Sequence, residues 1–354
     1  MPGRAKAERD SRRGPLLTVV LVMAAMLGAG CSSPTAPGDA VAVEPRVIPA
    51  GAQIVHPAPP SPPSTCGDPT ASYPPPSPMP APGNMPPGTF MAKIQARGRL
   101  VVGVDQNTYL WGYRDPITGL LSGFDIDMLR QVSQAIFGSN DLSKVEFRPI
   151  ANADRMKELN TTTDPVDIVA FTMTINCERE EPTPATLKQH GPVDFSTVYF
   201  EAGQQILVPK GSPITGPQDL GGKRVCAPKG STSERNLTVS PVPKNVIIWE
   251  VPNQTDCLVM LQQGEVDAIS TDNTILQGLA AQDPNTQLVG PTFSQEPYGM
   301  AISKAHPDFT AFVNGVLANI RSDGTWASIY AKWLGPFTPG PTPAPPPATY
   351  KATP

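Results

Sequence analysis

Short apolar runs alternate with amphipathic stretches through residues 91–335. The apolar runs predict strands and the stretches with apolar positions three or four apart predict helices. We expect strands at 100–104, 145–149, 168–171, 204–208, 224–227, 246–251, 266–270, 287–289 and 299–302. We expect helices at 125–136, 155–160, 232–237, 255–263, 273–281, 307–322 and 325–334. Strands that alternate with helices indicate an α/β protein.

The first of these helices has the clearest pattern. Ile126, Leu129, Val132 and Ile136 recur at helical spacing and form one apolar face. Asp125 precedes them and is a candidate N-cap, because its carboxylate can accept from the first free amides.

Two proline-rich segments flank the alternating region. Residues 31–90 hold 18 of the 45 prolines and residues 336–354 hold 8, whereas residues 91–335 hold 17. A polyproline-like tether over 31–90 would reach about 150 Å at roughly 3.1 Å per residue. The alternative is a proline-rich ligand for a partner domain. We expect a solvated spacer, and the same for the tail.

The N-terminus has the features of a signal peptide. Five basic residues within 4–13 precede a largely apolar run at 16–27, which is too short to span a bilayer. The junction at Cys31 resembles the cleavage site of a bacterial lipoprotein, although Leu27 stands one position earlier than usual. We predict a lipoprotein signal peptide at 1–30 and a lipid on Cys31. The alternative is an ordinary secreted protein cleaved nearby.

Four cysteines remain besides Cys31, an even number that favours two disulfides in an exported chain. They allow three connectivities. We expect Cys226–Cys257, because the first lies in a predicted strand and the second on a nearby predicted helix of the same region. Cys66–Cys177 follows by elimination and would attach the N-terminal segment to the core. Closely spaced cysteine pairs are absent, so no zinc site is expected.

Composition argues against several classes of function. The net charge is -4, only 16% of residues are charged, and the core has no basic block, so we expect no nucleic-acid partner. The three histidines, at 56, 190 and 306, are far apart, and neither a nucleophile elbow nor a P-loop occurs. We therefore expect no catalytic residue, no metal and no cofactor.

The order of several short segments resembles the polar amino-acid solute-binding proteins of ABC transporters. These segments are LVVGVD at 100–105, GFDID at 123–127, VDI at 166–168, MTINCER at 173–179, VDFS at 193–196, DLGGKRV at 219–225, GSTS at 230–233, GEVDA at 264–268 and Asp272. The lipoprotein form with paired cysteines looks most like the actinobacterial glutamate- and glutamine-binding lipoproteins.

The resemblance implies a two-lobe, type II periplasmic-binding-protein-like α/β fold with two hinge crossings and a ligand in the interlobe cleft. We expect lobe 1 at 91–203 plus 297–335, lobe 2 at 204–296, and crossings near 201–205 and 291–297.

The family motif places Arg179 at the ligand α-carboxylate, which a guanidinium fork can bind with two hydrogen bonds. Thr174 matches the first Thr of that motif and would meet the ligand backbone, while the Thr172 carbonyl would take the ammonium. Asn176-Cys177 departs from the usual residues, so the local turn can differ. Without the resemblance, chemistry alone favours a surface residue paired with Glu178 or Glu180.

Lobe 2 supplies two further candidates. The amide and hydroxyl of Thr232 would complete the carboxylate site, since free amides at a helix start bind anions. Ser231 and Glu234 form a capping box that needs no ligand, and both interpretations can hold. Asp272 resembles the family's ammonium-binding Asp; its alternative is an N-cap for the helix that follows.

Specificity is expected from lobe 1. Arg155 matches an Arg that meets the side-chain carboxylate in acidic-amino-acid binders of the family. Two cations facing Asp272 would favour glutamate or aspartate over glutamine. Alternatively, Arg155 pairs with Asp154 or Glu158.

Three residues of the first loop are weaker candidates for the cleft. Asp105 would prefer an amide or a cation. Tyr109 or Trp111 would cover the aliphatic part of the ligand, or would pack in the core.

We therefore predict a monomeric, membrane-anchored extracytoplasmic binding protein for glutamate or aspartate first and glutamine second. Its partner is an ABC permease or a membrane sensor. The alternative is an enzyme on the same scaffold, such as a dehydratase, for which His190 and Glu201 are the only loose acid-base candidates.

Overall fold

The computed structural model describes residues 47–59 and 66–352. The predicted signal peptide and Cys31 lie outside the described residues. Within the described part, no helix has the length and apolar character needed to cross a membrane.

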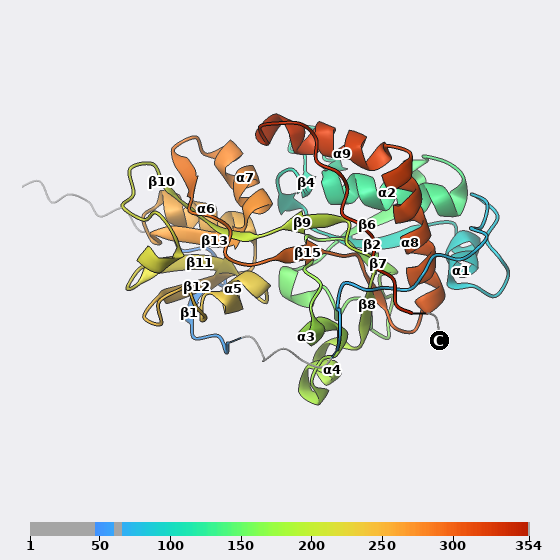
Figure 1. Ribbon diagram of the computed structural model, residues 1–354, viewed down its shortest axis with the longest axis horizontal. Coiled ribbons are helices and arrows are strands. Elements are labelled where there is room, and N and C mark those ends of the chain that lie inside the picture. Colours follow the sequence, from blue (N-terminus) through green and yellow to red (C-terminus); the bar gives the residue numbers. More distant parts are fainter. Residues whose placement is uncertain (1–46, 60–65, 353–354) are drawn as a thin grey trace, which may run out of the picture. The chain divides into compact units, whose positions relative to one another are not determined.

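Lobe 1 is built on a five-stranded sheet with the order β6-β2-β7-β16-β8 (Figure 1). The strands are β2 (Leu100–Val104), β6 (Val145–Pro149), β7 (Ile168–Val169), β8 (Val193–Phe195) and β16 (Ala301–Ser303). The helices of this lobe are α1 (Phe90–Arg97), α2 (Phe124–Phe137), α3 (Cys177–Glu180), α4 (Pro184–His190), α8 (Pro307–Ser322) and α9 (Thr325–Trp333). A small sheet of β3 (Asn107–Thr108), β4 (Gly112–Arg114) and β5 (Leu121–Ser122) completes it.

Both faces of the five-stranded sheet are covered by apolar side chains. Leu100, Val102 and Val104 of β2 belong to one core cluster, and Val101 between them belongs to another. Alternate residues of a strand point to opposite faces, so a continuous apolar run indicates a sheet buried on both sides.

Lobe 2 is built on a six-stranded sheet with the order β1-β12-β11-β13-β10-β14. The strands are β1 (Gln53–Val55), β10 (Gln204–Pro209), β11 (Arg224–Pro228), β12 (Ile247–Val251), β13 (Ala268–Asp272) and β14 (Thr286–Val289). The helices are α5 (Thr232–Asn236), α6 (Gln254–Gln262) and α7 (Asn273–Gln282).

From β2 onward, the chain passes between the two large sheets twice. β9 (Phe200–Ala202) lies between β8 and β10 in sequence, and β15 (Glu296–Tyr298) lies between β14 and β16. These two crossing strands pair with each other, with Glu296 opposite Ala202 (Figure 1). Two short paired strands of this kind suit a hinge, because small backbone changes there move whole lobes.

Two sequence expectations about helices were wrong. α2 carries the predicted apolar face, but it begins at Phe124 with Gly123 as its cap, so Asp125 lies inside the first turn. Gly123 has a φ of 138°, and a Cβ there would meet the Trp111 carbonyl oxygen, which makes this start possible only for glycine. Residues 155–160 form turns instead of the expected helix. The Asn160 side-chain amide donates to the Met156 carbonyl, which in an α-helix would accept from the Asn160 backbone amide.

The proline-rich segments also differ from the solvated spacer that we expected. β1 pairs with β12 as an edge strand of lobe 2. Further along the chain, the Ser72 hydroxyl donates to the Phe195 carbonyl at 2.6 Å, and Met79 packs where Gly315 leaves room on α8. Tail residue Tyr350 forms a bridge with Ser72. Within the described parts of these segments, Ser72 and Met79 therefore have partners in lobe 1, which a freely solvated tether would lack.

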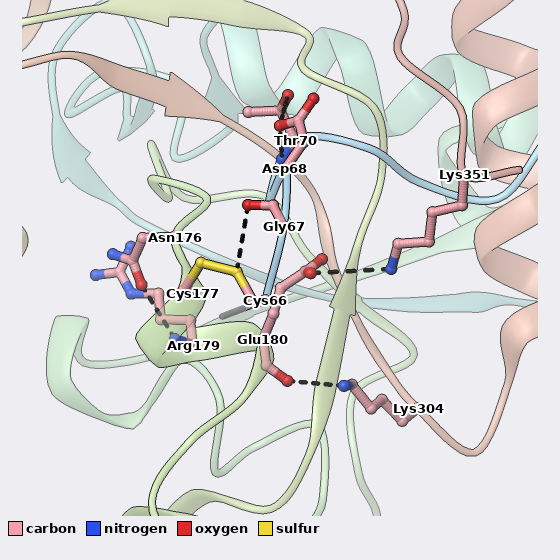
Figure 2. Close-up of a disulfide and its surroundings, with 10 residues drawn as sticks. All are labelled: Cys66, Gly67, Asp68, Thr70, Asn176, Cys177, Arg179, Glu180, Lys304 and Lys351. Atoms are coloured by element: carbon pink, nitrogen blue, oxygen red, sulfur yellow. Dashed lines mark hydrogen bonds and ion pairs between the residues drawn. A yellow bond between two sulfur atoms is a disulfide. The ribbon is translucent and has the colours of Figure 1, made fainter. Parts of the chain in front are cut away.

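Two disulfides join the four cysteines in the expected pairs. Cys226–Cys257 connects β11 to α6 inside lobe 2. Cys66–Cys177 connects the N-terminal segment to α3, and Figure 2 shows it beside Asn176 and Arg179. The second disulfide therefore ties the N-terminal segment to the element that carries Arg179.

Candidate functional site

One cavity is lined by residues of both lobes. Lobe 1 contributes Asn152, Arg155, Thr172, Thr174 and Arg179, and lobe 2 contributes Pro228, Ser231, Thr232, Ser233, Gln254, Thr271, Asp272 and Ile275. The lobes touch beside it, because the Asn152 amide donates to the Lys229 carbonyl at 2.6 Å. They leave a volume of about 10 Å³, so an amino acid can enter only when the lobes separate.

Arg179 is held in place by its own loop. Asn176 caps α3 by accepting from the Arg179 amide, and the Arg179 Nη1 donates to the Thr174 carbonyl. The side chain is only 5% exposed, which excludes the surface position that chemistry alone left open. Burial, and to a smaller extent the positive charge of the nearby Arg155, lower the pKa of Arg179 to about 9.

Arg155 lies on the same side of the cavity and is 4% exposed. Its Nε donates to the Asn152 carbonyl at 2.8 Å and its Nη1 to the Phe171 carbonyl at 3.0 Å. The guanidinium also stacks on the Phe171 ring, 5.3 Å from the ring centre. Burial lowers the pKa of Arg155 to about 10. Neither of the pairings with Asp154 and Glu158 that we considered is formed in the structure.

The two arginines share one unusual property. Within residues 47–59 and 66–352, no carboxylate forms an ion pair with either guanidinium. A buried cation without a paired anion is costly, and a bound carboxylate removes that cost. The cavity therefore favours an anionic group near each arginine.

Asp272 faces these cations from lobe 2. Its Oδ2 accepts from the Tyr298 hydroxyl at 2.5 Å and its Oδ1 from the Ser233 hydroxyl at 3.3 Å. It occupies the N-cap position of α7 but makes no capping hydrogen bond with its side chain, so the alternative role is not fulfilled. Burial, and then the charge of Glu296, raise the pKa of Asp272 to about 7.

The threonines of the cavity have distinct roles. Thr174 and Thr232 approach across the cleft, with their hydroxyl oxygens 3.4 Å apart, and both hydroxyls donate to Glu296. A hydroxyl has one proton, so these oxygens face a ligand as acceptors only, and the Thr232 amide remains as the donor. Thr172 has a φ of 43°, rare for a β-branched residue, and its amide donates to the Asp125 carboxylate at 2.8 Å.

The capping box predicted beside Thr232 is present in a modified form. The Ser231 hydroxyl accepts from the Glu234 amide at 3.0 Å. The Glu234 carboxylate accepts from the Gly230 amide at 2.8 Å. Helix capping and a cavity-lining Thr232 thus occur together.

Three predicted candidates lie outside the cavity lining. Trp111 is fully buried in the lobe 1 core, with its ring edge-on to Phe200 and Tyr298. Tyr109 packs edge-on against the ring of Tyr113. The Asp105 carboxylate accepts hydrogen bonds from the Thr108 hydroxyl and from the backbone amides of Gln106 and Asn107. It therefore stabilises its own loop.

Sequence reasoning missed several residues of the site. Asn152, Gln254 and Thr271 line the cavity, and Glu296 lies directly behind it. No motif marks Glu296; only its place near an expected hinge crossing could have drawn attention to it. No group of His, Cys, Asp or Glu suited to a metal ion occurs among the residues described.

Comparisons with known proteins identify the family of the chain. The family model for bacterial extracellular solute-binding proteins, family 3, matches residues 100–336. The ABC transporter glutamine-binding protein GlnH of Bacillus subtilis is 38% identical over 245 residues, which cover 69% of this chain and 84% of that protein. The glutamate-binding protein GluB of Corynebacterium efficiens is 30% identical over 256 residues, or 70% of this chain and 82% of that protein.

A solved structure shows the same fold. An ancestral arginine-binding protein bound to glutamine is 36% identical, with a TM-score of 0.58. The match covers 68% of this chain and 99% of that one.

Proposed function

The chain belongs to family 3 of the bacterial extracellular solute-binding proteins, and we propose that it binds glutamate or aspartate first and glutamine second. Its relatives are binding proteins of amino-acid transport, and the chain is a binding protein rather than an enzyme. The names of the relatives cover both glutamine and glutamate and give no order between them.

The observation that supports an acidic ligand is the pair of buried guanidiniums without a paired carboxylate. The ligand α-carboxylate would lie against Arg179 and the Thr232 amide. The ammonium would lie against Asp272, the Thr172 carbonyl and the hydroxyl oxygen of Thr174. Such a fork and carboxylate match the two charged ends of an amino acid.

The side chain of the ligand would extend to Arg155. A carboxylate there offers Arg155 a charged acceptor, whereas an amide offers a neutral oxygen and a surplus donor. Charge-assisted hydrogen bonds are about twice as strong as neutral ones. Glutamate should therefore bind better than glutamine.

Arg155→Gln is expected to weaken glutamate binding by about 2 kcal/mol, roughly thirtyfold, and glutamine binding by much less. The amide keeps a polar group against the ligand side chain but removes the cation. Titration calorimetry of wild type and variant with glutamate, aspartate and glutamine tests both the function and the role of Arg155. Equal losses for glutamate and glutamine would remove Arg155 from specificity, and absence of binding to wild type would reject the function.

Glutamate affinity is also expected to fall by about tenfold from pH 8 to pH 6. The raised pKa of Asp272, about 7, means that the free carboxyl gains a proton over this range and loses its attraction for the ammonium. Calorimetry in buffers of different ionisation enthalpy should detect proton release on binding near pH 7.

Two other buried carboxyls need controls, because burial raises the pKa of Asp125 and of Glu180 to about 7 as well. Neither lines the cavity. The pH dependence should persist in Asp125→Asn and in Glu180→Gln. Its disappearance in either variant would assign the titration to that residue instead of Asp272.

Delivery to an ABC permease is the role that the family names support, and a membrane sensor that recognises the same closed form is the alternative. A lipid on Cys31 would keep the protein at the membrane, since each buried CH₂ contributes about 0.8 kcal/mol. Cys31→Ser should release the protein from membrane fractions, and its retention there would contradict the anchor.

A further inference from the structure

Glu296 stands at the first position of β15, one of the two crossings between the lobes. Its side chain is 1% exposed. No ion pair neutralises it within the described part of the chain. A buried carboxylate without an ion pair needs several hydrogen-bond donors. The parts of the molecule that supply these donors therefore indicate the role of Glu296.

The donors come from both lobes. Glu296 Oε2 accepts from the Thr174 hydroxyl of lobe 1 at 2.6 Å and from the Thr232 hydroxyl of lobe 2 at 2.7 Å. The other oxygen, Oε1, accepts from the Asn236 amide on α5 at 3.0 Å and from the Ser294 hydroxyl at 2.6 Å. A single oxygen atom on the hinge therefore joins a hydroxyl from each side of the cleft.

We propose that Glu296 is an interlobe latch, a positioning residue that stabilises the closed form through Thr174 and Thr232. This inference rests on the proposed function, because the closed form is the one that would retain an amino acid. When the lobes open, the two threonines separate and one oxygen cannot keep both hydrogen bonds. Because the acceptor is charged, each bond is stronger than a neutral one.

The latch also determines which hydrogen-bonding groups the two threonines present to the ligand. The two threonine protons point to Glu296, so both oxygens turn their lone pairs toward the cavity. The latch is complete only when the two halves of the site come together. Closure and assembly of the amino-acid site are thus the same event.

Glu296→Gln tests the latch through the rate at which ligand escapes, since escape requires opening. Gln keeps the size of the side chain, but its NH₂ group cannot accept from a hydroxyl. Stopped-flow measurements with glutamate and with glutamine should give dissociation rates about tenfold higher than in wild type. Association rates should stay within about twofold, and both ligands should be affected by the same factor.

Ser294→Ala is the matched control. It removes a hydrogen bond to the same carboxylate, but Ser294 lies on the hinge segment beside Glu296. The hydrogen bonds from Thr174 and Thr232, which join the two lobes, remain. Its dissociation rates should remain within about twofold of wild type. Glu296→Asp is the second variant if the Gln variant fails to fold; its shorter side chain keeps the charge but cannot reach both threonines, so escape should again accelerate.

Three results would overturn the latch. Unchanged dissociation rates in both Glu296 variants would show that closure does not depend on it. Slower escape of glutamate alone in Glu296→Gln would show that the carboxylate only repels an anionic ligand. Absence of binding of glutamate and glutamine to the wild type would reject the proposed function, and the latch with it.

Discussion

Arg179→Ala is expected to abolish measurable binding of glutamate, a loss of about 3–5 kcal/mol. The variant removes the cation that the proposed α-carboxylate site depends on, and the buried carboxylate of the ligand would keep only the neutral Thr232 amide as a donor. Arg179→Lys should recover only part of the loss, because an ammonium keeps the charge but lacks the planar fork. Titration calorimetry with glutamate measures both variants.

Arg224→Ala is the control for Arg179. Arg224 also carries a guanidinium, but it is part of a half-exposed ion pair with Asp267 and does not line the cavity. Its affinity for glutamate should match wild type. Binding retained by Arg179→Ala, with a folded protein by circular dichroism, would contradict the assignment of the carboxylate site.

Removal of the Cys66–Cys177 disulfide should lower the free energy of unfolding by about 4–5 kcal/mol. This bond closes a loop with a sequence separation of 111 residues, so its loss releases much conformational freedom in the unfolded chain. Urea unfolding of Cys66→Ala/Cys177→Ala followed by circular dichroism measures the change. The affinity for glutamate should stay within about threefold, because Asn176 and the Thr174 carbonyl still hold Arg179.

Cys226→Ala/Cys257→Ala provides the comparison. Its disulfide lies inside lobe 2 and leaves α3 attached to the N-terminal segment. This double variant should also have a lower free energy of unfolding and should keep the wild-type affinity for glutamate. A loss below about 1 kcal/mol for the Cys66 and Cys177 variant would contradict the view that the N-terminal segment is an integral part of the fold.

Local sequence patterns predicted several of the regular elements that bury apolar residues, but not α1 or β8. The helix containing Ile126 and Leu129 and the strand at 100–104 both occur, because burial of their apolar residues fixes element and orientation together. The two-lobe arrangement did not follow from such patterns; it came from the order of segments that resembles the family.

The errors arose where long-range contacts decide the local structure. Proline content suggested a spacer, yet a serine hydroxyl and two methionines, Met79 and Met85, anchor the N-terminal segment to lobe 1. For Trp111 the sequence left a ligand contact and core packing both open, because aromatic residues suit either, and the core contacts prevail.

The site itself was predictable in part. Six of the nine ligand candidates line the cavity: Arg155, Thr172, Thr174, Arg179, Thr232 and Asp272. Glu296 escaped prediction because the two threonines that it joins across the cleft lie 122 and 64 residues away in sequence.

A thermal-shift measurement of residues 32–354 with each of the twenty amino acids tests the central claim most directly. A ligand at about 100 times its Kd adds about 2.7 kcal/mol to the free energy of unfolding, which raises the Tm measurably. Glutamate and aspartate should give the largest shifts, with a smaller shift for glutamine. A shift with glutamine but none with glutamate, or no shift with any amino acid, would contradict the assignment of an acidic ligand to the two buried arginines.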